Sequence, residues 1–156
     1  MPLLKEKLEE LKSQISRHVP VEFFSIDGKG DCYTLQPKNQ GVSLGYSNSR
    51  SGVFGANRLL ASLQRFEKVA FGAFQAHKEH RIAFPLEGDL EEPFFLKLIE
   101  CGLNGVLLSE SKKLDQELAK RFDLQVIIKV ELATDFKHLS PFDETYLAGL
   151  KALIAS

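Results

Sequence analysis

The sequence predicts one α/β domain with an N-terminal helix, an antiparallel β-meander and a βαβαβ-like C-terminal half that ends in a helix. Three observations support this prediction. The chain has 156 residues and no linker-like segment or internal repeat, so residues 1–156 are expected to form a single globular domain. Its first half holds short extended segments separated by turn residues. Its last third alternates apolar, strand-like segments with amphipathic helical ones.

The first segment is predicted to be a helix that ends before Pro20. Leu4, Leu8, Leu11 and Ile15 follow one another at spacings of four, three and four residues, which places them on one helix face. Pro20 ends the helix because the residue before a proline avoids the α conformation. This apolar stripe could pack within the domain or against a second copy of the chain in a dimer.

Three extended segments follow, over residues 21–26, 32–36 and 42–46, with turn-forming residues at 27–31 and 37–41. Because connections this short cannot make a parallel crossover, the strands are expected to pair antiparallel. Alternation places Tyr33 and Leu35 on one face of the second strand. On the third strand it points Val42, Leu44 and Tyr46 inward.

The middle of the chain is predicted to hold a helix from about Val53 to Glu67, with an apolar face formed by Leu59, Leu60, Leu63 and Phe66. Two strands are expected next, at 69–74 and 81–86. The polar residues 75–80 between them have the length of a hairpin loop.

Residues 81–130 are expected to run strand, helix, strand, helix, strand, with right-handed crossovers and locally parallel pairing. Gly102 should end the first of these helices, and Ser111 should cap the second, which carries Leu114, Leu118 and Phe122. A last helix is expected to begin at Ser140. The strands are expected to bury Val106, Leu107, Val126 and Ile128.

Composition excludes several classes of protein. Apolar side chains make up 44% of the chain, too many for a disordered protein, and 20 Lys+Arg against 21 Asp+Glu give a net charge of -1, which argues against nucleic-acid binding. No apolar run approaches the ~20 residues that cross a bilayer, and charges interrupt the place where a signal peptide is apolar. Cys32 and Cys101 are too few for a secreted disulfide framework. A cytoplasmic protein without a cofactor or membrane association is expected.

The best functional candidate is the polar stretch before the second predicted helix, which contains Ser47, Ser49, Arg50, Ser51 and Gly52. Unpaired N–H groups and the positive end of a helix dipole favour a phosphate or carboxylate, and an arginine adds two donors. The pattern lacks the lysine of a Walker A loop. If an anion binds, the N–H groups near Ser51 and Gly52 should contact it, and Arg50→Ala should weaken binding while leaving folding nearly unchanged. The alternative is that these residues only cap the helix and turn the chain.

Charge distribution adds modest support. Residues 47–82 carry six Lys/Arg and two Glu, a local balance of +4. The basic residues would matter for binding only if they lie on one face, and otherwise they form an ordinary solvated surface.

A weaker candidate is a metal site made of His77, Glu79 and His80, since two imidazoles and a carboxylate can ligate a divalent ion. The three residues lie in a predicted turn and lack the helical spacing that aims two histidines at one ion. A solvated loop tip is the expected outcome, and no metal is expected.

Adjacent aromatic residues at Phe23 and Phe24 must point to opposite faces of the first strand. One of them is therefore a candidate contact in a dimer. The sequence carries no complete catalytic motif, so the leading prediction is a non-enzymatic binding or regulatory module that forms a homodimer. The alternative is a small enzyme or ligand-binding protein that takes a phosphorylated or carboxylated molecule at Ser47–Gly52.

Overall fold

A computed structural model describes residues 2–76, 80–85 and 90–129 of the chain. It confirms the mixed α/β class. The elements in chain order are α1 (Pro2–Ser16), β1 (Val21–Ser25), β2 (Cys32–Lys38), β3 (Gly41–Tyr46), α2 (Ser49–Gln64), β4 (Gly72–Gln75), β5 (Ile82–Ala83), α3 (Glu92–Glu100), β6 (Gly105–Ser109), α4 (Lys113–Arg121) and β7 (Gln125–Lys129). The final helix expected from Ser140 lies outside the described residues.

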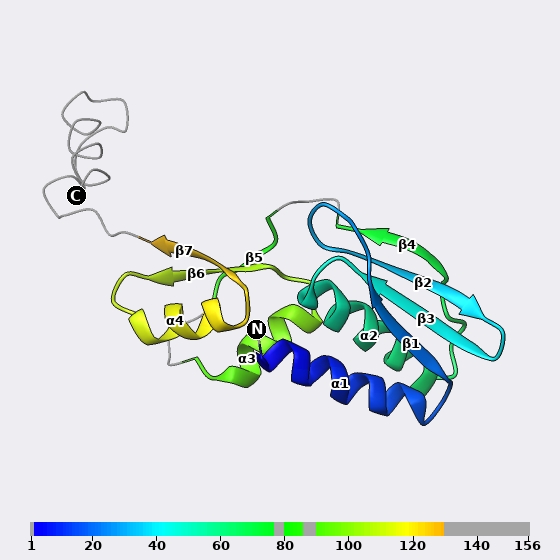
Figure 1. Cartoon of the computed structure of the whole chain (residues 1–156). Coiled ribbons are helices and arrows are strands. Elements are labelled where there is room, and N and C mark those ends of the chain that lie inside the picture. Colours follow the sequence, from blue (N-terminus) through cyan, green and yellow to red (C-terminus); the bar gives the residue numbers. More distant parts are fainter. Residues whose placement is uncertain (1, 77–79, 86–89, 130–156) are drawn as a thin grey trace, which may run out of the picture.

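The strands form two sheets that lie side by side in Figure 1. The first has the order β1-β3-β2-β4, and the second has the order β5-β6-β7. Helix α2 packs against β2 and β3 of the first sheet, α4 packs against β6 and β7 of the second, and α3 contacts α2 between them. One cluster of buried apolar residues runs through both halves.

The stripe on α1 is buried within the fold. Leu4, Leu8, Leu11 and Ile15 are each at most 4% exposed, and α1 packs along α2. The sequence allowed this stripe to pack within the domain or against a second copy of the chain, and the structure shows the packing within the domain. The stripe is therefore not available to a second copy.

The expectation of an antiparallel meander is wrong for β1. Strands β2 and β3 are antiparallel, but β1 pairs in parallel with β3. Both Ser25, at the end of β1, and Tyr33, near the start of β2, pair with Tyr46. The connection between β1 and β2 therefore passes over the end of β3, and its six residues can span the roughly 10 Å that separates the outer two of three strands. The rule that short connections give antiparallel pairing applies only to strands that become neighbours in a sheet. Strands β1 and β2 are not neighbours.

Strand β2 runs two residues further than predicted and includes Pro37, which lies opposite Val42. Its pairing with β4 covers only Cys32 to Leu35. Among the described residues, the outer edge of β2 has no pairing partner at Pro37, where the missing N–H costs no ladder hydrogen bond.

The hairpin expected between residues 69–74 and 81–86 is also wrong. Strand β4 pairs antiparallel with β2, whereas β5 pairs in parallel with β6 in the other sheet. Gly105 allows this second pairing to be close, since a Cβ at that position would lie 2.4 Å from Ile82 Cδ1. The chain therefore crosses from one sheet to the other between β4 and β5.

The predicted order of elements and the parallel pairing over β5–β7 are confirmed. Val106 is fully buried and Leu107 and Val126 are half-buried, but Ile128 is 45% exposed. Ile128 lies on β7, which is an edge strand within the described sheet and pairs with β6 alone. A strand covered on one side only cannot bury its outer residues as fully as a central strand does.

Helix α4 begins one residue later than predicted. Its N-cap is Lys112, with no side-chain cap, and Ser111 Oγ instead lies 3.0 Å from Ser109 Oγ. Leu114 lies in the first turn of α4 and is 87% exposed, whereas Phe122 is buried as expected. Gly102 ends α3 with a φ of 81°, the left-handed conformation that glycine adopts at no steric cost.

No helix among the described residues has the length and apolar character needed to span a membrane.

Candidate functional site

Helix α2 starts at Ser49, four residues before the predicted start, because Asn48 and Ser51 form a capping box. The Asn48 side chain accepts a hydrogen bond from the Ser51 N–H at 3.0 Å, and Ser51 Oγ accepts one from the Asn48 N–H at 3.2 Å. The Gly52 N–H donates to the Asn48 carbonyl. The N–H groups of Ser51 and Gly52, which the sequence analysis expected to contact an anion, are thus hydrogen-bonded within the chain. A capping box stabilises a helix start in this way.

Asp31, in the loop before β2, is the centre of an ionic cluster. Its Oδ1 accepts from Asn48 Nδ2 at 2.8 Å and from Arg50 Nη2 at 3.0 Å, while its Oδ2 pairs with Arg81 Nη2. The Asp31 side chain is 10% exposed. Arg50 also lies 3.1 Å from Asp123 Oδ2, which follows α4. The cluster therefore links the first sheet, α2 and the second sheet.

The electrostatics of Asp31 follow from these partners. Burial by itself raises the pKa of the carboxyl, but the hydrogen bond from Asn48 and the charge of Arg50 oppose it and prevail. The pKa of Asp31 is therefore lowered from its ordinary 3.8. A carboxylate held in this way stays ionised and is a poor base.

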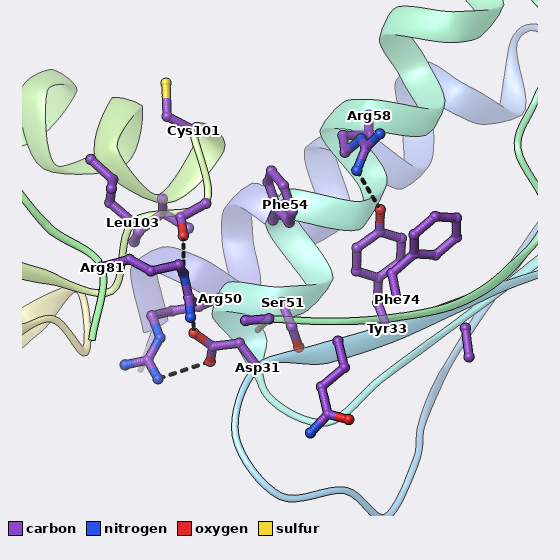
Figure 2. A pocket seen from close by; sticks show the side chains of 15 residues that line it. Asp31, Tyr33, Arg50, Ser51, Phe54, Arg58, Phe74, Arg81, Cys101 and Leu103 are labelled. Carbon is purple, nitrogen blue, oxygen red and sulfur yellow. Dashed lines mark hydrogen bonds and ion pairs between the residues drawn. The ribbon is translucent and has the colours of Figure 1, made fainter. Parts of the chain in front are cut away.

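A cavity of about 790 Å³ opens beside the cluster, a size typical of sites for small molecules. It lies where α2, α3, β2, β4 and the start of β5 approach one another. Its charged lining residues are Arg50, Arg58, Arg81 and Asp31, so positive charge is in excess. Figure 2 shows Arg50 and Arg81 converging on Asp31, with Arg58 and Tyr33 meeting separately.

The far part of the cavity combines an arginine with three aromatic rings. Arg58 Nη1 donates to the Tyr33 hydroxyl at 3.3 Å, and the guanidinium carbon lies 5.7 Å from the ring centres of both Phe54 and Phe74. The rings of Tyr33 and Phe74 stack at 4.8 Å, and Phe54 meets Tyr33 edge-on at 5.9 Å. Arg58 is an exposed residue, and these cation–aromatic contacts favour the observed position of its guanidinium.

Two packing features hold Tyr33 in this position. Its residue exposure is only 3%, and Gly55 of α2 lies against its ring, so that a Cβ there would be 2.8 Å from the ring carbons. Burial raises the pKa of Tyr33 above its ordinary 10.0, although the charge of Arg58 opposes the rise. The hydroxyl is therefore protonated at neutral pH and has a hydrogen to donate.

Of the residues proposed from the sequence, Arg50 and Ser51 line this cavity. Ser47 instead ties two loops together: its hydroxyl accepts from the Cys32 N–H at 3.0 Å and donates to the Gly30 carbonyl at 2.7 Å. Ser49 and Gly52 are parts of the first turn of α2 and are not among the lining residues.

For the metal candidate, His77 and Glu79 lie outside the described residues, and His80 Nδ1 lies 2.8 Å from Gln125 Oε1. Within the described ranges no group of three or more His, Cys, Asp or Glu side chains could hold a metal ion.

Sequence patterns missed Asp31, Tyr33 and the aromatic part of the site. Asp31 was predicted to be a turn residue, and Tyr33 a strand residue of the core. One available signal was the spacing of Ser51, Phe54 and Arg58, which follow one another at three and four residues and so share a face of α2. The local excess of Lys and Arg was a second signal, since three of those six residues line the cavity.

Comparison with known proteins adds no functional assignment. No protein-family model and no curated protein matches the sequence. Among solved structures, a family 89 glycoside hydrolase from Clostridium perfringens in complex with PUGNAc is similar with a TM-score of 0.42 and 17% identity. The similarity covers 68% of this chain and 16% of the hydrolase chain. At this level it indicates neither a shared activity nor a shared ligand.

Proposed function

We propose that the chain is a non-enzymatic binding or regulatory module whose cavity takes a small carboxylated or phosphorylated molecule. The observation that carries the proposal is the state of Arg58. Asp31 and Asp123 neutralise Arg50, and Asp31 also pairs with Arg81, whereas no carboxylate among the described residues pairs with Arg58. An arginine without a carboxylate, beside a protonated tyrosine hydroxyl, is a site for an oxyanion.

Binding is preferred to catalysis because the described cavity offers no activated nucleophile or base. Asp31 is held by two arginines, and the Ser51 hydroxyl belongs to the capping box. Cys101 also lines the cavity, but no histidine is among the described lining residues. A thiol becomes a nucleophile only with a nearby base or a lowered pKa.

Calorimetric titration with inorganic phosphate and methyl phosphate tests the proposal. Wild type should give saturable heat, and Arg58→Gln should weaken binding by roughly 10- to 150-fold, the range for one hydrogen bond to a charged partner. Arg65→Gln is the control, since it removes the same charge from an exposed position at the end of α2. Its affinity should equal that of wild type.

The same titration locates the anion. Suppose that Arg50→Ala remains folded and loses the affinity expected above for Arg58→Gln, while Arg58→Gln itself binds as wild type does. The anion would then lie at the start of α2, as the sequence pattern suggested. No saturable heat with wild-type protein would remove the binding function altogether.

A homodimer is the proposed assembly, with β1 as the contact. The stripe of α1 is buried inside the fold, but Phe24 is 39% exposed on β1, and β1 forms one edge of the sheet as described over residues 2–76. An edge strand that carries an exposed aromatic ring is suited to pair with a second copy. Light scattering at micromolar concentration should give twice the chain mass of 17.5 kDa. A Phe24→Ser variant should be monomeric, and a wild-type mass of one chain would exclude the dimer.

A cytoplasmic location is proposed on the state of the two cysteines. Cys32 and Cys101 are both free thiols, and Cys101 is exposed. Exposed free thiols persist in the reducing cytosol. Immunofluorescence or fractionation of the tagged chain tests the location.

A further inference from the structure

We infer that the ligand of the cavity carries its acid group on a planar ring, as an aryl phosphate or an aromatic carboxylate does. This inference rests on the proposed function, because it assumes that an anion binds at Arg58. It names the class of anion from the surroundings of that arginine.

The first step concerns the two donors. Arg58 Nη1 and the Tyr33 hydroxyl are 3.3 Å apart, and the hydroxyl accepts the hydrogen bond between them. The hydrogen of the Tyr33 hydroxyl meets no acceptor in the part of the chain that the structure describes. Arg58 and Tyr33 can therefore donate to the same acid group, one through the guanidinium and the other through the hydroxyl. That geometry fixes where the acid group lies in the cavity.

The second step concerns what lies next to that position. The guanidinium carbon of Arg58 lies over the rings of both Phe54 and Phe74, 5.7 Å from each centre. Both phenylalanines are half-buried, and both line the cavity. An acid group bound at Arg58 consequently places the atom attached to it against these rings. A planar ring gains more from this contact than an alkyl group of equal length, because aromatic rings attract one another through stacked and edge-on arrangements.

The third step concerns the remainder of the cavity. Beyond Phe54 the walls include the apolar side chains of Ile99 and Leu103, which suit the body of an apolar ring. The other end holds the Asp31 cluster, in which Arg50 and Arg81 are already paired with carboxylates. A second acid group at that end would compete with Asp31 for its partners. The cavity thus favours a molecule with one acid group and an apolar ring.

The test compares phenyl phosphate with methyl phosphate, which share an acid group and differ in the ring. By calorimetry, wild type should bind phenyl phosphate roughly tenfold more tightly, a difference within reach of one aromatic contact and its burial. Phe54→Leu keeps an apolar side chain but removes the ring, and should bring the two affinities within about threefold of each other. Phe71→Leu is the control, because Phe71 is 46% exposed and is not among the lining residues.

The outcomes separate the inference from the proposed function. Equal affinities of wild type for both phosphates would overturn the inference and leave anion binding intact, whereas binding of neither would overturn both. Arg58→Gln should weaken both ligands by the same factor. If Phe54→Leu does not fold, Phe74→Leu provides the same comparison. In methyl-resolved NMR, phenyl phosphate alone should produce ring-current shifts at Ile99 and Leu103, and shifts confined to methyl groups elsewhere would count against the site.

Discussion

At the scale of single residues, Asp31 does more for the structure than its place in a turn suggests. One carboxylate accepts from Asn48 and Arg50 at the start of α2 and from Arg81 just before β5. Arg50, the residue that the sequence marked for binding a ligand, is thereby part of the framework around the cavity. Removing one partner from a buried ionic cluster leaves the others uncompensated, which is costly.

We expect Asp31→Asn to lower the free energy of unfolding at pH 7 by about 3 kcal/mol. The pKa of Asp31 is depressed in the folded state, so its contribution is present above the unfolded pKa, which is about 3.9, and is lost as pH falls through the folded pKa. The difference between wild type and Asp31→Asn should therefore shrink below about pH 4. Urea unfolding at several pH values measures it.

Asp27→Asn is the matched control, since Asp27 is an exposed residue of the same loop. It should change stability by less than about 0.5 kcal/mol. A difference for Asp31→Asn that stays constant from pH 7 to pH 3 would show that its charge is not what stabilises the fold.

At the scale of elements, α2 has a well-formed start and a strained end. Its capping box satisfies the first turn, but at the other end Phe66 adopts a φ of 56° and is 97% exposed. The left-handed conformation costs a residue with a side chain roughly 1–2 kcal/mol. The helix α3 ends in the same conformation with Gly102, where the cost is absent.

Phe66→Gly should stabilise the protein by about 0.5–1 kcal/mol, because relief of the backbone strain exceeds the entropy that glycine adds to the unfolded chain. The thermal midpoint should rise by roughly 1–4 °C. Gly102→Ala is the reverse substitution and should destabilise, as its Cβ would also lie 3.1 Å from the Phe54 ring. Scanning calorimetry of both variants decides the point, and a lower midpoint for Phe66→Gly would contradict it.

Local sequence patterns predicted most helices and strands, but they did not predict which strands pair with which. The stripe of α1 and the alternation of Tyr33 and Leu35 depend on neighbours in sequence, and both sets of side chains are buried as expected. The pairing of β1 with β3, and the separation of β4 from β5, depend on residues far apart in the chain. Hydrophobic period carries no information on which strand becomes the neighbour.

In the candidate site, too, sequence patterns found residues of one segment and missed residues contributed by other parts of the chain. A pattern in one segment pointed to Arg50 and Ser51, and both reach the cavity. Arg81 joins them because the two sheets meet there, and Tyr33 because β2 packs against α2. No local signal specifies either contact. The start of α2 was misplaced because serine and asparagine favour both loops and caps, and the reciprocal bond between Asn48 and Ser51 decides between them.

At the scale of the whole molecule, the two sheets are joined by the contact of α2 with α3 and by the cluster at Asp31. The buried apolar residues form one cluster that includes Leu44 of the first sheet and Val106 of the second. We therefore expect urea unfolding to be one cooperative transition. Tyrosine fluorescence and far-UV circular dichroism should give coincident curves, and two separate midpoints would indicate two units that unfold independently.

The pairing of β1 with β3 also sets an order of assembly. Strands β2 and β3 are joined by a tight turn, with Lys38 opposite Gly41, and a hairpin of this kind closes in roughly 1–10 μs. Within the described residues, strand β1 has no neighbour in its sheet except β3, so we expect it to add to the sheet after the hairpin has formed. In stopped-flow experiments, Phe24→Ala in β1 should mainly speed unfolding, whereas Val42→Ala in β3 should slow folding. Until β1 arrives, the edge of β3 is open, and the newly made chain is exposed during that interval to pairing with other unfolded chains.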